Sequence, residues 1–356
     1  MDAAGAWRAF VAGLGEAGER LARRTELLSP AERADGFRAL LRALHNQLGR
    51  FEVDRERPEL VPFNGGRQKF FMDNPDFLYW VADIRPDRRY RVHGTRGDAA
   101  FVSLTAYATS GITDSSAAAR LDSDSLTFDG AGRFSVTLSA ELPATGDWLQ
   151  LPENASSVWV RQFYEDVRRD SLGTCAIEAL DGGPPPAFIE PERFARHLAK
   201  LGPTMSRIAA VLGAAEQDER PRANQVRRWS EMQGGAAFTE PGIQYLRGAW
   251  ELGPEQALVL EGDAVPCRYW NVLLYSRFLN SLDHRHRTVS LTGSRIPLRH
   301  GRYRLVLAAR DPGVTGWLDT EGRPFGLFVL RWLQPERTPP LPELRVARWD
   351  EVAHAP

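Results

Sequence analysis

The 356-residue chain has little of several features that would point to a specific class of protein. It has only two cysteines, Cys175 and Cys267, and their separation fits neither a disulfide framework nor a zinc knuckle. Its 45 Lys and Arg residues balance 46 Asp and Glu residues, so the formal net charge of -1 gives no general attraction to a polyanion. We therefore expect two half-buried free thiols and no nucleic-acid partner.

Long apolar runs are also missing. No stretch of 18 or more apolar residues occurs, and charged residues such as Arg8, Glu16 and Arg20 interrupt the N-terminal segment. The sequence therefore predicts neither a membrane span nor a signal peptide, and a cytoplasmic location is the default expectation.

Motifs of the common nucleotide-binding and hydrolase classes are absent as well. The sequence contains no Gly-x-Ser-x-Gly elbow, phosphate loop, dinucleotide fingerprint or His-Glu-x-x-His motif. We therefore expect no organic cofactor.

The sequence does contain clear signals of secondary structure. Residues 1–51 have the periodicity of two helices, and Ser29, Pro30 and Glu32 predict that the second begins at about residue 30. Alternating β-branched and aromatic residues then predict strands, before a helical pattern returns after Tyr164 and continues towards Leu212. Strand character resumes at about 257–332. The strands expected in the first region are 90–93, 99–107, 133–139 and 157–163.

The two strand-rich regions can be aligned by spacing. Gly94 to Tyr107 and Gly262 to Tyr275 both span 13 positions, while Gly132 to Trp148 and Gly301 to Trp317 both span 16. Since correlated spacings are typical of an internal repeat, we expect that one β-rich domain was duplicated in tandem.

We therefore predict a mostly β protein with α additions. It should contain two tandemly duplicated β-sandwich or jelly-roll-like domains, an N-terminal helical pair and a helical insert between the repeats. The expected boundaries are 1–75 for the N-terminal helices and connecting loop, 76–166 for the first β-rich repeat, 167–245 for the helical insert, 246–337 for the second β-rich repeat and 338–356 for a Pro-rich tail.

Several of these motifs resemble known bacterial families. On residues 269–275, 301–303 and 316–319, the C-terminal half resembles domain-of-unknown-function family 1214, although Gly316 stands where the family usually carries Asn. Residues 73–76 and 90–94 are similar to family 1254, which often precedes it. The resemblance implies a β-rich two-part architecture with helical additions, and it implies no activity.

A cluster of titratable residues at 283–287 is the strongest candidate for chemistry. On a strand, His284 and His286 would face one side roughly 6 to 7 Å apart, but no spacing identifies a third metal ligand. A charged loop, a metal site and metal-free acid/base work all stay open. We take His284, His286, Asp283 and Tyr275 as candidate catalytic residues and predict no metal.

Two arginines recur at equivalent positions in the last strand of each repeat. If buried, Arg161 and Arg331 need either structural partners or a shared cleft in which they would clamp a carboxylate, sulfate or phosphate. Trp317 fits either a core plug or a ligand-stacking role, and Asp76 fits either a turn or a functional carboxylate. The candidate substrate-binding residues are Tyr79, Trp80, Trp270, Arg277, Trp317, Arg161 and Arg331.

Two functions fit these residues, and each of them requires a small-molecule ligand or a binding surface. The first is a cofactor-independent hydrolase, lyase or isomerase that acts on a small, largely apolar substrate of the lipid, steroid or aromatic acid class. The second is a non-catalytic module that binds carbohydrate, lipid or protein, because fold alone does not decide function. The sequence leaves a homo-oligomer open.

Overall fold

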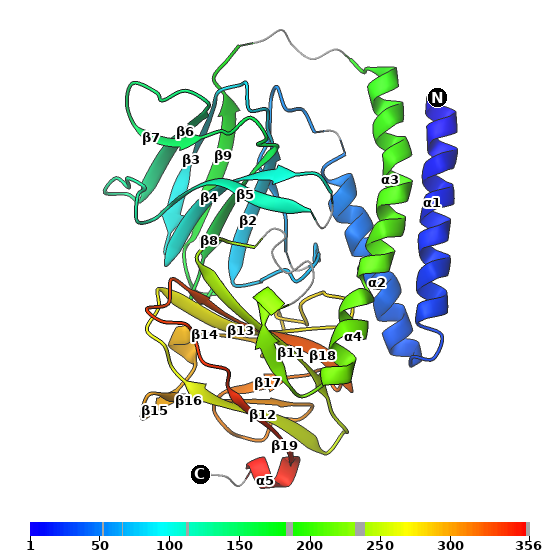
Figure 1. Ribbon diagram of the computed structural model, residues 1–356, viewed down its shortest axis with the longest axis vertical. Coiled ribbons are helices and arrows are strands. Elements are labelled where there is room, and N and C mark those ends of the chain that lie inside the picture. Colours follow the sequence, from blue (N-terminus) through cyan, green and yellow to red (C-terminus); the bar gives the residue numbers. More distant parts are fainter. Residues whose placement is uncertain (52, 66, 112–113, 183–187, 232–238, 354–356) are drawn as a thin grey trace.

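The computed structural model of the protein describes residues 1–51, 53–65, 67–111, 114–182, 188–231 and 239–353. Two units of paired β-sheets are stacked along the long axis, and the longer helices run along one side of them (Figure 1). The N-terminus lies at the free end of the first helix, and the last described residues, up to Ala353, lie beyond the sheets of the second β unit (Figure 1). The expected mostly β architecture with an N-terminal helical pair and a helical insert is confirmed.

The helices begin where local chemistry predicts. α1 (Ala3–Arg24) is followed by α2 (Pro30–Leu48), and the Ser29 hydroxyl accepts a hydrogen bond from the Glu32 backbone N–H at 3.3 Å, so the expected cap is confirmed. α3 (Pro191–Val211) returns alongside α1 (Figure 1). The shorter helices are α4 (Ala214–Glu219), η1 (Arg220–Arg222), η2 (Trp229–Glu231), η3 (Gly293–Arg295) and α5 (Trp349–Ala353).

The first unit packs two sheets, here called sheets A and B, around an apolar core that includes Val92, Leu104 and Val160. Sheet A has the order β1 (Val61–Pro62), β2 (Phe77–Asp83), β8 (Ser157–Phe163), β4 (Phe101–Thr109) and β5 (Ser115–Asp122). Sheet B has the order β7 (Asp147–Gln150), β6 (Arg133–Ser139), β3 (Tyr90–Gly97) and β9 (Leu172–Ala179).

The second unit packs sheets C and D around a core that includes Leu258, Leu274 and Leu330. Sheet C has the order β10 (Val226–Arg228), β11 (Ile243–Glu251), β18 (Phe325–Leu333), β13 (Tyr269–Tyr275) and β14 (Ser290–Thr292). Sheet D has the order β15 (Leu298–Arg299), β16 (Arg302–Ala308), β12 (Gln256–Asp263) and β19 (Glu343–Arg348), and β17 (Trp317–Asp319) pairs with β16.

The two units share their strand order. Sheet A and sheet C correspond strand for strand, and β7 runs parallel to β6 just as β17 runs parallel to β16. The Trp148 indole donates a hydrogen bond to the Ser139 carbonyl at 3.2 Å, and the Trp317 indole donates one to the Ala308 carbonyl at 3.1 Å. Both indoles therefore hold the backbone of a neighbouring strand in the same way.

β9 (Leu172–Ala179) and β19 (Glu343–Arg348) lie in segments where the sequence predicted a helix and a Pro-rich tail. The helical pattern predicted after Tyr164 is wrong for residues 172–179, which form β9 at the edge of sheet B. Residues 343–348 form β19 at the edge of sheet D, within the segment expected to be a Pro-rich tail. Both are edge strands with little fully buried surface: Cys175, Ile177 and Ala179 of β9 alternate towards the core but are only partly buried, and Ala347 is the one buried residue of β19.

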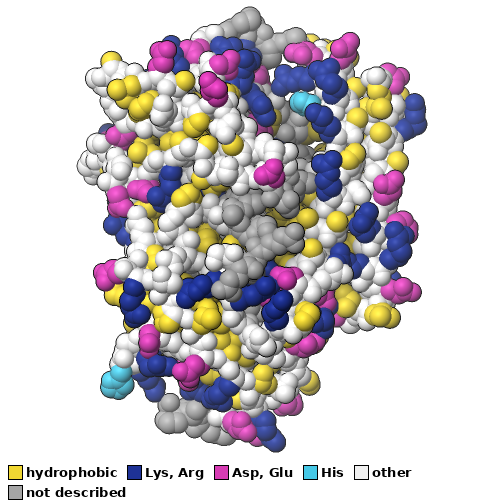
Figure 2. All heavy atoms as spheres, viewed as in Figure 1, with side chains coloured by type: hydrophobic (Ala, Val, Ile, Leu, Met, Phe, Trp, Pro, Cys, Tyr) yellow, Lys and Arg dark blue, Asp and Glu magenta, His cyan; other side chains and the backbone are white. Residues whose placement is uncertain are grey.

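The composition has the expected consequences for the surface. Cys175 and Cys267 are unpaired and half-buried, as expected. Acidic and basic side chains are interspersed over the face shown in Figure 2, in keeping with the formal net charge of -1. None of the described helices combines the length and the apolar character needed to cross a membrane.

α1 and α3 approach each other at two glycines. A Cβ added at Gly13 would lie 2.6 Å from the backbone of Gly202, and a Cβ added at Gly202 would lie 2.9 Å from the Ala9 carbonyl oxygen. The missing side chains therefore allow the two backbones to touch.

We expect Gly13→Ala to destabilise the protein by about 1–3 kcal/mol, because the new methyl group forces α1 and α3 apart. Gly18→Ala is the matched control in the same helix, since a Cβ there meets nothing within 4 Å. Alanine favours the helix, so the control should be neutral or stabilising by up to about 1 kcal/mol. Thermal unfolding followed by circular dichroism measures both, and equal effects would contradict the close glycine contact.

Candidate functional site

Sheets A and C pack against each other between the two units. Phe77 and Phe163 of sheet A contact Tyr269 of sheet C, with ring centroids 5.5 and 5.8 Å apart, and Leu333 belongs to the same cluster. Because side chains alternate along a strand, residues two positions along from these aromatics face the same contact.

Equivalent rows of residues cross each sheet beside this aromatic cluster. The rows are Tyr79–Arg161–Ser103 in sheet A and Tyr245–Arg331–Asn271 in sheet C, each made of direct cross-strand neighbours. The two predicted arginines therefore occupy the same position in their units. Together with Tyr107 and Tyr275 from β4 and β13, these rows form what we call the arginine–tyrosine centre.

Arg161 is buried, with only 2% of its side chain exposed, and its guanidinium forms an ion pair and hydrogen bonds. Its Nη1 donates to Oε2 of Glu240 at 2.8 Å, and its Nη2 donates to the Tyr107 hydroxyl at 3.0 Å. Glu240, equally buried, also accepts a hydrogen bond from Nε of Arg120 at 2.8 Å. A buried carboxylate thus neutralises the Arg161 charge and offsets the cost of its desolvation.

Arg331 is also buried but is not neutralised in this way. Its Nη2 donates to the Tyr275 hydroxyl at 2.6 Å, and its Cζ lies 5.8 and 5.7 Å from the ring centroids of Tyr245 and Tyr275. Its Nη1 has no hydrogen-bond partner among the described residues, and none of their carboxylates forms an ion pair with it. The guanidinium therefore bears its desolvation cost without a bonded counter-ion.

The tyrosines around Arg331 supply dipoles but no counter-charge. Burial raises the pKa of Tyr79 and of Tyr275 well above the usual range, and it raises the pKa of Tyr245 to about 12. All three are neutral phenols at pH 7, so none supplies a negative charge, and the rings of Tyr245 and Tyr275 attract the Arg331 guanidinium through their quadrupoles. Tyr79 and Tyr245 remain partly exposed although they lie between the two sheets.

Further buried polar atoms near this contact lack partners. The Ser103 hydroxyl, Oδ1 of Asn271 and the Tyr269 hydroxyl form no hydrogen bond within the part of the chain that the structure describes. Buried polar groups in proteins nearly always have a partner, so several unpaired groups on one contact surface point to a polar ligand or ordered water there.

The segment before β2 lies beside this centre and joins the two units. The Asp73 carboxylate accepts hydrogen bonds from the Ser281 backbone N–H at 3.0 Å and from its hydroxyl at 2.7 Å. The Asp76 carboxylate accepts one from Nδ2 of Asn271 at 2.8 Å and one from the Ser290 hydroxyl. The hydrogen bonds of both carboxylates therefore link the first unit to the second.

Asp76 forms the turn that its sequence context allowed, and its carboxylate is also buried. Its backbone N–H donates to Oδ1 of Asn74 at 3.0 Å, which is turn chemistry, while its carboxylate is buried. Burial raises the pKa of Asp76, and the hydrogen bonds from Ser290 and Asn271 counteract this only in part.

A small polar cavity of about 30 Å³ opens beside Asp76, large enough for a single water molecule. Burial, with the charges of Lys69 and Arg168, lowers the pKa of His284 to about 4, so its imidazole is neutral at pH 7. The ring Nδ1 of His284 is buried without a hydrogen-bond partner among the described residues. The lining residues are Pro75, Asp76, Asp166, Val167, Arg168, His284, Arg287, Thr288, Ser290 and Arg295.

Of the alternatives left open for 283–287, the chain forms the charged loop and not a strand, because the strand begins only at Ser290, so His284 and His286 do not share a strand face. The turn before it directs His286 outwards, where its exposed ring lies 2.9 Å from the Asp283 carboxylate. Among the described residues, no three or more His, Cys, Asp or Glu side chains are grouped as a metal site would require.

The structure brings only part of the predicted set together. Tyr79, Tyr275, Arg161 and Arg331 share the arginine–tyrosine centre, whereas the other members lie elsewhere. Trp80 packs on the core between sheets A and B, and Trp270 stacks on Trp332 in the core of the second unit. Trp317 packs on the outer side of sheet D. Arg277 forms ion pairs with Glu32 at 2.5 Å and with Glu216 at 2.6 Å.

Several residues of the centre are missing from the predicted set. Tyr107 was already an anchor of the repeat spacing, and extending the alignment to β2 and β11 would have matched Tyr245 with Tyr79. Glu240 lies outside both predicted strand regions, so no pattern in the sequence connects it to Arg161. Asn271 is a polar residue in a buried strand, which is the one signal that could have identified it.

Comparison with known proteins supports the architecture. Residues 82–166 match a family described as "Protein of unknown function (DUF1214)". The match falls on the first unit, which corrects the expectation that the C-terminal half carries it, and it includes residues 90–94, which had been attributed to family 1254. A search of curated proteins found no match.

Two solved structures share the fold. An uncharacterised protein from Burkholderia cenocepacia is 26% identical, with a TM-score of 0.90 and 97% of each chain covered. A protein from Vibrio parahaemolyticus is 13% identical, with a TM-score of 0.50, and the alignment covers 88% of this chain and 98% of that one. The chain is thus similar over nearly its whole length to a protein built from the same two β units and helices.

We expect the half-buried His284 to make the protein sensitive to acid. Its pKa is lowered from 6.5 to about 4, so the unfolded chain binds a proton between these pH values while the folded protein does not, and stability falls as pH falls through this window. The contribution lost at pH 5 is about 1–2 kcal/mol. Thermal midpoints at pH 7 and pH 5 should therefore differ less in His284→Gln than in the unmodified protein.

His286→Gln is the matched control, because the His286 ring is exposed two residues away. It should keep the acid sensitivity of the unmodified protein. An identical loss of acid sensitivity in both variants would rule out the His284 imidazole as its source.

The two arginines should respond differently to replacement. Arg161→Met leaves the buried Glu240 carboxylate with the ion pair to Arg120 and a long hydrogen bond from Thr105, so we expect a loss of about 3 kcal/mol. Arg331→Met removes a buried charge that has no ion pair, so the change should be within about 1 kcal/mol or stabilising. Urea unfolding measures both, and equal losses would contradict the difference in compensation.

Proposed function

We propose that the protein binds a small, largely apolar molecule that bears a carboxylate, and that Arg331 holds this carboxylate between sheets A and C. One observation carries the proposal. Arg161 has the Glu240 carboxylate at 2.8 Å, whereas Arg331, at the corresponding position, forms no ion pair with a described residue. A ligand carboxylate would take at Arg331 the place that Glu240 takes at Arg161.

The surroundings of Arg331 suit such a ligand. A guanidinium can donate two parallel hydrogen bonds to a carboxylate, and Nη1 is available for one of them. The unpaired Tyr269 hydroxyl could donate another, and the partly exposed rings of Tyr79 and Tyr245 would contact an apolar or aromatic body. This combination favours the aromatic acid class over neutral lipids and steroids.

The likeness of the two units supports the proposal. We interpret their shared strand order as a tandem duplication, in which the buried arginine was copied and its carboxylate partner was not. An inherited cation without an inherited counter-ion is a natural place for ligand recognition. The cytoplasmic location, a homo-oligomer and the similarity to family 1254 stay predictions from the sequence.

Acid/base chemistry is the second candidate function, and the cavity beside Asp76 favours it. His284 is neutral at pH 7 and can accept a proton, while the raised pKa of Asp76 makes it easier for that carboxyl to hold one. If the bound acid is also transformed, His284→Gln should abolish turnover and leave binding unchanged.

Titration calorimetry with benzoate, 4-hydroxybenzoate, decanoate and cholate tests the binding proposal. At least one acid should bind, and the corresponding primary amide should not, because it carries no charge to pair with Arg331. Arg331→Met should weaken binding at least about 30-fold, as expected for the loss of a buried charge pair. Arg8→Met, at an exposed position of α1, is the control and should bind as the unmodified protein does.

Binding that survives Arg331→Met, or that is equal for acid and amide, would overturn the assignment of Arg331. If no acid binds and a carbohydrate, a neutral lipid or a protein does, the non-catalytic binding module becomes the better description. Arg331→Lys keeps the charge without the planar fork and should recover only part of the affinity.

A further inference from the structure

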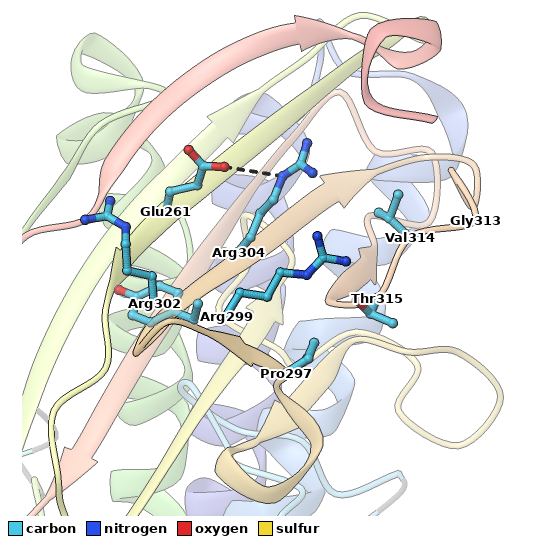
Figure 3. Close-up of a pocket in the computed structure, with 9 residues that line it drawn as sticks. Glu261, Pro297, Arg299, Arg302, Arg304, Gly313, Val314 and Thr315 are labelled. Carbon is cyan, nitrogen blue, oxygen red and sulfur yellow. Dashed lines mark ion pairs between the residues drawn. The ribbon is translucent and has the colours of Figure 1, made fainter. Parts of the chain in front are cut away.

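A groove of about 510 Å³ lies on the outer side of the second unit. Figure 3 shows this groove between the hairpin of β15 and β16 and the turn that precedes β17. Its volume is in the range of small-molecule pockets. The lining residues are Glu261, Pro297, Arg299, Arg302, Tyr303, Arg304, Gly313, Val314 and Thr315.

A tight hairpin places two arginines side by side at the groove. His300 and Gly301 are the only residues between β15 and β16, and both have positive φ values, 51° and 76°. This turn makes Arg299 and Arg302 direct cross-strand neighbours. Like charges in such a pair repel each other, and a non-glycine residue with positive φ adds a cost of about 1 kcal/mol.

Acidic residues compensate only part of this charge. Arg302 pairs with Asp263 at 2.9 Å, and Nε of Arg304 lies 3.4 Å from the Glu261 carboxylate. Arg299 forms no ion pair with any residue that the structure describes. The groove therefore keeps a net positive charge at Arg299.

The side chains converge on one place. The guanidinium groups of Arg299 and Arg304 both point towards Val314, whereas Arg302 points away from them (Figure 3). Pro297 and Val314 supply apolar surface beside these two cations. The arrangement suits a ligand with a small anionic head and an apolar body.

The groove belongs to the second unit alone. In the first unit, Ser135 stands at the position of Arg304, and among the described strands none corresponds to β15. Arg299 and Arg304 are therefore additions to the shared sandwich and not part of what the two units need to fold.

From these observations we infer that the groove binds the phosphate group of a small phosphate monoester, held between Arg299 and Arg304. A phosphate dianion matches two guanidinium groups, since each can donate to two of its oxygens. The site is independent of the carboxylate proposed at Arg331, so either assignment can fail while the other holds.

Titration of the full-length protein with phenyl phosphate tests the inference. We expect measurable binding that Arg299→Gln and Arg304→Gln each weaken at least 10-fold, while Arg302→Gln changes it less than 3-fold. Arg331→Met should leave this binding unchanged. Inorganic phosphate should bind more weakly than phenyl phosphate, because it cannot contact Pro297 and Val314.

Three results would overturn the inference. The first is no binding of phenyl phosphate to the unmodified protein, and the second is binding that both Arg299→Gln and Arg304→Gln leave intact. The third is binding of a short DNA duplex that depends on Arg299 while phenyl phosphate does not bind, which would make the groove a polyanion surface. Circular dichroism of each variant checks that these exposed substitutions leave the fold intact.

Discussion

The buried guanidinium groups between sheets A and C set the strongest constraint on this molecule. A charge removed from water must meet an opposite charge or a set of hydrogen bonds, and the two units meet this need in different ways. Arg161 has the carboxylate of Glu240, while Arg331 has one phenol and two aromatic faces. The shared strand order of the units makes this difference visible, because the arginines occupy the same row of the same sheet.

The same contact explains why the two sandwiches form one structure. Asp73 and Asp76 belong to the first unit, yet their carboxylates bind Ser281, Asn271 and Ser290 of the second. Their hydrogen bonds are made at the edge of the arginine–tyrosine centre, so the segment that joins the units also positions the residues around Arg331. Separation of the units would break these hydrogen bonds and expose the aromatic cluster of Phe77, Phe163 and Tyr269 to water.

Much of the fold could be predicted from the sequence, because the signals are local or periodic. The cap at Ser29 marks the start of α2, and the spacing of Tyr107 and Tyr275 places β4 and β13 in equivalent positions. β9 and β19 escaped prediction since they are edge strands with little buried surface.

The site was harder to predict from the sequence. Arg161 and Arg331 could be found because each lies among the alternating apolar residues of a strand. The contact of Glu240 with Arg161 could not, because it depends on how distant segments of the chain meet. For 283–287 the sequence left a charged loop and a chemical site open, and the chain forms a turn there, with His284 at the small cavity and His286 exposed.

The position of Glu240 in the chain has a consequence for the order in which the protein can mature. All strands of sheets A and B lie before residue 180, whereas the carboxylate that neutralises Arg161 is synthesised about 60 residues later. While the chain emerges from the ribosome, the first sandwich would thus hold Arg161 on a face that water still covers, before Glu240 reaches it. Its final stability depends on a segment that arrives only when the second sandwich is being made, which couples the maturation of one half to the synthesis of the other.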